Sequence, residues 1–183
     1  MLLRIVLLAC CFGGSEAVRA FDILWTHSKC TVQNTDYVTS FVCLLGKLPG
    51  RQNKNYIDTK LCFKRTISNM TIHFRASVPR PLSDNYYNFN FMTNGCELNK
   101  VSSKNNALKA VLKRLVQVGN SLWRCPMQAN FTYSVDRFAL SPEHFPSYMP
   151  DMNFTVKMQF ITDKSIEMVA AEAGIALVRK NKN

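Results

Sequence analysis

Alternation of apolar and polar residues is the feature that most constrains how this chain can fold. In "NFTVKMQF", residues 153–160, every second side chain is apolar and those between are polar. A period of two is typical of a strand with one buried and one solvent-facing side. The pattern recurs in "NMTIHFRASV", "YIDTKLCFKRTI", "NYYNFNFM" and "NFTYSVDRF", and more weakly in "DYVTSFVCLL". Six or more one-sided strands separated by turn-rich breaks predict an all-β fold, with two antiparallel sheets packed as a sandwich or cup.

One segment has a helical period instead. Between residues 104 and 118, Leu108, Val111, Leu112 and Leu115 recur at helical spacing, and Gly119-Asn120 supplies a stop signal. We expect an amphipathic helix over 104–118 that covers a sheet edge. The C-terminal segment "SIEMVAAEAGIALVRK" has the Ala and Glu content of a helix and the Ile and Leu pattern of a closing strand, so both assignments stay open.

The N-terminus predicts the compartment. Arg4 precedes an apolar run over residues 5–12, and small residues follow with cleavage sites after Ala17 or Ala20. The apolar run is too short to span a bilayer, so residues 1–20 are typical of a secretory signal peptide. We therefore expect a secreted, extracellular protein with a single domain over residues 21–183.

Charge and cysteine content limit the partners. The formal net charge is +11, but no DNA- or RNA-binding motif accompanies it, and we expect a solvated basic surface and no nucleic-acid partner. Of seven cysteines, Cys10 and Cys11 lie in the signal peptide, which leaves an odd number, five. Two disulfides and one free thiol are expected. With no C-x-x-C pair and three scattered histidines, no metal site is expected.

Cys62 lies on the polar face of its predicted strand, among Asp58, Lys60 and Lys64. It is therefore either a partly exposed thiol that could pair with a second copy or a shielded free thiol. We expect a protein that is mainly monomeric, with a dimer through Cys62 as the alternative.

Three Asn-x-Thr acceptor sites for N-linked glycans begin at Asn69, Asn130 and Asn153. In each, alternation places the Asn and the Thr on the wet side of a strand and the middle residue on the inner side. Glycans would then cover the outer surface and leave the apolar faces undisturbed.

Large apolar side chains crowd the predicted inner faces. They form either an ordinary sandwich core or the wall of a cup that admits an apolar ligand, and periodicity does not separate the two. The candidate cavity residues are Phe63, Phe74, Tyr87, Phe89, Phe91, Phe131, Tyr133, Phe154, Met158 and Phe160.

Catalytic signatures are missing from the sequence. It contains no G-x-S-x-G elbow, no H-E-x-x-H pair and no phosphate-binding glycine loop, and its carboxylates are scattered. We expect a protein that is not an enzyme and that uses no cofactor.

The order of short motifs is similar to that of a known family. Cys30 is followed by Cys43 in "YVTSFVCLL", then by "NFNFMTNGCEL", a helix, "GNSLWRCPM" and "FPSYMPDMNFTVKMQF". This order resembles a large insect family of small secreted proteins of unknown function, related to the ML lipid-recognition and ganglioside-activator-like fold. Asn120 with Cys125-Pro126 is the most specific match.

The resemblance implies an ML-like β-cup with an apolar cavity between its sheets. It also implies disulfides between Cys30 and Cys43 and between Cys96 and Cys125, and it extends to chemosensory accessory proteins. The expected function is thus non-enzymatic binding of a lipid or other small hydrophobic ligand, with a membrane receptor as a further partner. The alternative is a protein or glycan interaction module without a cavity.

Overall fold

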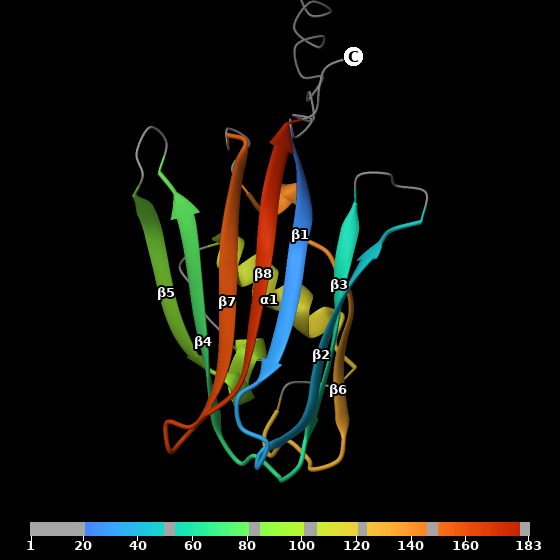
Figure 1. Ribbon diagram of the computed structural model, residues 1–183, viewed down its shortest axis with the longest axis vertical. Helices are drawn as coiled ribbons and strands as arrows, with labels where there is room; N and C mark the ends of the chain where they lie inside the picture. The colour runs from blue at the N-terminus through green and yellow to red at the C-terminus, as the bar shows by residue number, and fades with distance from the viewer. Residues whose placement is uncertain are drawn as a thin grey trace, which may run out of the picture.

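In the part of the chain that the structure describes, eight antiparallel strands form two sheets (Figure 1). The computed structural model describes residues 21–49, 54–80, 85–100, 106–120, 124–145 and 150–179, so the expected signal peptide lies outside the described residues. The larger sheet has the order β1 (Phe21–Val32), β8 (Glu167–Arg179), β7 (Met152–Thr162), β4 (Met70–Pro79) and β5 (Tyr86–Asn94). The smaller sheet has the order β2 (Val38–Lys47), β3 (Asn55–Phe63) and β6 (Thr132–Phe138). The predicted all-β, two-sheet fold is confirmed.

Alternation along the strands decides which side faces the other sheet. In β4, Met70 and Ile72 are fully buried, while the polar residues between the inward positions lie on the outer face. In β7, Phe160 is buried and Asn153 and Lys157 are exposed. Removal of the apolar faces from water is the main force that holds the two sheets together.

The C-terminal segment that the sequence left open is a strand. β8 pairs with β1 on one side and with β7 on the other, so it lies within the larger sheet. Val169, Ile175 and Leu177 of β8 are buried. The two neighbouring strands satisfy its backbone hydrogen bonds, and this tertiary context outweighs the helix preference of its alanines and glutamates.

The predicted helix is present as α1 (Asn106–Gln117). It begins and ends within the predicted 104–118 range, of which residues 104 and 105 lie outside the described part. Leu112 and Leu115 are buried, whereas Lys109, Lys113 and Arg114 are exposed. In Figure 1, α1 runs behind the larger sheet and contacts β6 of the smaller one. The helix thus closes the side on which β5 and β6 belong to different sheets.

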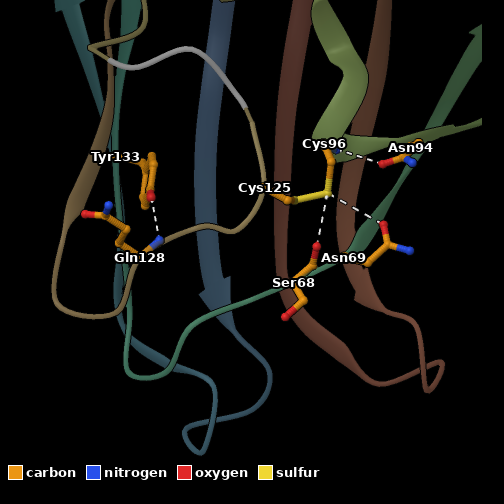
Figure 2. Close-up of a disulfide and its surroundings, with 7 residues drawn as sticks. All are labelled: Ser68, Asn69, Asn94, Cys96, Cys125, Gln128 and Tyr133. Atoms are coloured by element: carbon orange, nitrogen blue, oxygen red, sulfur yellow. Dashed lines mark hydrogen bonds between the residues drawn. A yellow bond between two sulfur atoms is a disulfide. The ribbon is translucent and has the colours of Figure 1, made fainter.

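A disulfide lies on each of the two long sides of the sandwich. Cys30 of β1 and Cys43 of β2 form a disulfide with a Cα–Cα distance of 5.4 Å, which joins the two sheets directly. On the helical side, Cys96 in the 3₁₀ helix η2 (Gly95–Lys100) is bonded to Cys125, which follows α1 (Figure 2). Both pairs are those that the resemblance implied.

Asn120, which belongs to the most specific match of the resemblance, forms hydrogen bonds with the backbone of β6 at the edge that β3 does not pair with. Its side-chain Nδ2 donates to the carbonyl of Thr132 at 2.8 Å, and its Oδ1 accepts from the N–H of Ser134 at 2.9 Å. The N–H of Asn120 also donates to the carbonyl of Ser134. Residues 118–120 therefore act as a short extra strand that covers the edge of β6.

Candidate ligand cavity

A cavity of about 610 Å³ lies between the two sheets. All eight strands and α1 contribute to its wall, and the segment around the 3₁₀ helix η3 (Pro142–His144) adds Leu140 and Phe145. The volume lies within the range of known small-molecule sites, about 300–1,000 Å³. The sheets are therefore not packed on each other along their whole length, as the two inner faces of a filled sandwich would be.

Aromatic pairs from opposite sheets meet at two places in the wall. Phe41 of β2 meets Phe160 of β7 edge to face, with ring centroids 6.4 Å apart. Trp25 of β1 lies 5.8 Å from Phe138 of β6, and its indole Nε1 donates to the Phe138 carbonyl at 3.2 Å. Phe41 and Phe160 belong to one buried cluster and Trp25 to the other, while Phe138 packs against both.

Small side chains on the larger sheet leave the room that the cavity occupies. Ala171 and Ala173 of β8 and Ala76 of β4 all line the wall. Their inward neighbours on β7 are the longer Val156 and Met158, which pair with Ala173 and Ala171. A larger residue at either β8 position would fill the space, because its Cβ points into the cavity.

Two residues that border the cavity have a charged or an amide side chain, and these contact a histidine on the outer face of the larger sheet. Arg75 and Asn90 border the cavity, but the guanidinium of Arg75 contacts the imidazole of His73, with Nε 3.3 Å from its Nε2. The Nε2 of His73 in turn contacts the Oδ1 of Asn90. Among the described wall residues, Thr59, which alternates with Ile57 and Leu61, and Tyr133 carry hydroxyl groups. The interior is thus suited to an uncharged, apolar molecule.

Seven of the ten residues predicted to face a cavity do line it. They are Phe74, Phe89, Phe91, Tyr133, Phe154, Met158 and Phe160. The phenolic oxygen of Tyr133 accepts a hydrogen bond from the N–H of Gln128 at 2.7 Å, which fixes the ring in the wall (Figure 2).

The other three predicted residues, Phe63, Tyr87 and Phe131, are not among the wall residues. Phe63, the last residue of β3, is fully buried in the packed core. Its ring centroid lies 5.8 Å from that of Tyr133. Tyr87 is 49% exposed beneath the guanidinium of Arg80. Phe131 is exposed because Asn130, with φ of 59°, turns the chain before β6 begins, and the strand alternation does not extend back to it.

Several wall residues were missed by the sequence reasoning. Trp25 follows Phe21 and Ile23 at alternate positions in β1, so a period of two was present there but was not used. Leu140 and Phe145 come from an irregular segment, where no periodicity exists to reveal them. The further wall residues are Phe41, Cys43, Ile57, Thr59, Leu61, Val78, Val111, Leu115, Val135, Phe138, Met152, Val156 and Ile175.

The three glycan acceptor asparagines are all exposed. Oδ1 of Asn69 lies 3.6 Å from the Cys96 sulfur. The side-chain nitrogen of Asn69, the atom that would carry a glycan, points away from the disulfide (Figure 2). The middle residues Met70 and Phe154 turn inward as predicted, whereas Phe131 does not. Glycans at these sites remain a prediction.

Cys62 is a free, half-buried thiol. Among the described residues, no three His, Cys, Asp or Glu side chains lie together in a way that could hold a metal ion. In the same part of the chain, no helix is long and apolar enough to cross a membrane. The two disulfides fit an oxidising compartment.

The outer face of the larger sheet carries a row of charges opposite the cavity. Lys157 Nζ donates to Glu172 Oε2 at 2.8 Å, and this hydrogen bond lowers the pKa of the Glu172 carboxyl, with further lowering by the charges of Lys157, His27 and Lys29. His27 Nε2 lies 3.9 Å from Glu172 Oε1. The charges stay on the solvent side, which leaves the inner side of the same strands apolar.

Residues 68–156 match a family model described as a protein of unknown function (DUF1091). The matched range runs from the start of β4 through α1 and β6 into β7, and it includes Asn120 and both cysteines of the Cys96–Cys125 disulfide. No curated protein matches the chain.

Proposed function

We propose that this chain is a secreted, non-enzymatic binding protein that encloses a lipid or another small hydrophobic molecule between its two sheets. The observation that carries the proposal is the cavity of about 610 Å³, whose wall is almost wholly apolar and aromatic. Burial of ligand surface in such a wall is worth about 25 cal/mol per Å² before the costs of association.

The relationship to ML-like lipid-recognition proteins, the insect origin and a chemosensory accessory role belong to the same proposal. They rest on the motif order in the sequence. The open volume between the two sheets favours this proposal over the alternative, a secreted protein or glycan interaction module without a ligand cavity.

A neutral fluorescent naphthylamine tests the proposal. The chain has two tryptophans, Trp25 in the cavity wall and Trp123. In a Trp123→Phe background, energy transfer from Trp25 to the bound probe reports occupancy of this cavity. We expect saturable, one-to-one transfer that a long-chain alcohol displaces.

Two substitutions on the same strand make the test specific. Ala173→Phe places a ring in the cavity and should weaken probe binding at least about tenfold, which corresponds to about 1.4 kcal/mol. Ala170→Phe is the matched control, because Ala170 lies three residues away on the same strand and pairs with Gln159 on the outer face. Loss of binding in both variants, or in neither, would contradict binding in this cavity, provided that thermal melts show both to be folded.

A further inference from the structure

The free edge of β5 is the one sheet edge in the described part of the chain that no other segment covers. β1 and β2 lie side by side and are joined by the Cys30–Cys43 disulfide. The edge of β6 is covered by residues 118–120. β5 ends the larger sheet, pairs with β4 on one side only, and has no described element beyond it in Figure 1.

β5 also lacks the features that keep exposed strands apart. Edge strands in monomeric proteins are usually short, or they carry Lys, Pro or a bulge that prevents pairing with another chain. β5 is nine residues long, "YYNFNFMTN", without a charged residue or a proline, and its pairing with β4 has no register shift. Large apolar side chains are exposed on both of its faces, among them Tyr86, Phe89 and Met92. Such an edge is suited to receive another strand.

The order of residues in β5 indicates that the strand that pairs with this edge is a second copy of β5. Around Phe89, the residue types match at equal distances in both directions: Asn88 with Asn90, and Tyr87 with Phe91. Two copies of β5 that run antiparallel about an axis through Phe89 would bring these matching residues opposite each other. Aromatic pairs would then lie on the cavity side and Asn pairs on the outer side, the kind of cross-strand contact that stabilises sheets.

We propose that two copies of this chain associate through β5, antiparallel and centred on Phe89, so that their larger sheets join into one continuous sheet. A two-fold axis gives the same patch on both partners, which is the commonest form of homodimer. The contact is one strand pair wide, so we expect a reversible dimer with a dissociation constant in the micromolar range. The proposal does not depend on ligand binding, since its readout is the mass of the particle in solution.

Sedimentation of the Cys62→Ser protein across a micromolar concentration series tests the association without a disulfide through Cys62. We expect monomer at low concentration and dimer at high concentration. Phe89→Lys places like charges opposite each other and should weaken dimerisation at least about tenfold. Leu44→Lys on β2 is the matched control, because Leu44 and Phe89 are both 58% exposed, and it should leave the dimer intact.

Opposite charges identify the partner as a second copy. Phe89→Lys and Phe89→Glu proteins should each dimerise more weakly alone than when combined, because Lys and Glu then face each other across the axis of a mixed dimer. Wild-type protein that stays monomeric at the highest concentration would overturn the proposal. A dimer that Phe89→Lys leaves unchanged, or a mixture that stays monomeric, would also overturn it.

A cysteine at the axis measures the register. Antiparallel partners have Cα atoms about 4.5–5.5 Å apart, within the range that a disulfide bridges. In the Cys62→Ser background, Phe89→Cys should therefore form a covalent dimer under mild oxidation, and Leu44→Cys should not. Equal cross-linking of both variants would indicate random collision and contradict the proposed axis.

Discussion

The ring of Phe41 on β2 meets the ring of Phe160 on β7 edge to face, with an angle of 84° between their planes. One phenylalanine comes from the smaller sheet and the other from the larger, and both line the cavity. The pair is therefore a place where the two sheets come into contact within the wall of the cavity. Trp25 and Phe138 make the corresponding contact within the second core cluster.

Ligand charge should decide affinity, because no charged group among the described wall residues is turned into the cavity. A long-chain alcohol and the carboxylic acid of equal length should bind alike only when the acid is protonated. The free carboxyl has an ordinary pKa of about 4, and burial of its ionised form is costly. We expect acid affinity to fall by up to about a hundredfold from pH 5 to pH 7, with the alcohol unchanged, as measured by displacement of the neutral probe. Equal affinities at pH 7 would place the head group outside the cavity.

Removal of the Cys30–Cys43 disulfide should loosen the two sheets where β1 meets β2. Closure of a loop with a sequence separation of 13 is worth about 3 kcal/mol in the chain-entropy model. The Cys30→Ser, Cys43→Ser protein should therefore lose about that much unfolding free energy in urea titrations. Cys62→Ser serves as the control, since that thiol is free, and it should change stability little. A stability loss no larger than that of the control would show that the packed core alone holds the sheets together.

Asn120→Ala should destabilise the fold although the side chain is exposed. The substitution removes both the donor to the Thr132 carbonyl and the acceptor for the Ser134 N–H. Each hydrogen bond contributes about 0.5–1.5 kcal/mol net, so we expect a loss of about 1–3 kcal/mol in chemical denaturation. Asn88→Ala, which removes a single exposed hydrogen bond from Ser77 Oγ, is the comparison, measured at concentrations where the protein is monomeric. If Asn120→Ala costs no more than Asn88→Ala, the side chain does not hold residues 118–120 to β6.

Glu172 should give a small acid-dependent contribution to stability. The hydrogen bond from Lys157 lowers the pKa of the carboxyl in the folded protein. Its contribution is then fully present above the unfolded-state pKa, about 4.3, and is lost as the pH falls through the folded value. Because the side chain is 40% exposed, we expect Glu172→Gln to cost less than about 1 kcal/mol at pH 7. In urea titrations this difference should shrink as the pH is lowered from 7 through the folded-state pKa, and a difference that stays unchanged in acid would have another cause.

Much of the fold follows from alternation, because a strand between two sheets must turn one side inward. The inner faces of β3, β4 and β7 were predicted residue by residue, and α1 was placed to within two residues. The strand state of β8 was not decidable, because its alanines and glutamates favour a helix when taken alone. Its position between β1 and β7 is a property of the whole sheet and not of the segment.

The cavity was predictable only in part. Alternation identified Phe154, Met158 and Phe160 as inward-facing residues. It does not distinguish a strand that faces a cavity from one that faces a packed core, because both have the same pattern. What separates the two cases is the size of residues far apart in sequence, here Ala76 on β4 and Ala173 on β8. Phe63 is on the inward face of β3, as alternation predicts, but it is buried in the packed core and does not line the cavity.

The most direct test is native mass spectrometry of the protein purified from insect-cell medium, followed by organic extraction of the same material. We predict a reproducible adduct of one small apolar molecule per chain, which the Ala170→Phe protein retains and the Ala173→Phe protein lacks. An unliganded mass, with nothing in the extract above that of a control purification, would contradict the account unless added alcohol restored a one-to-one complex. An adduct carried equally by both variants would place the ligand elsewhere on the molecule.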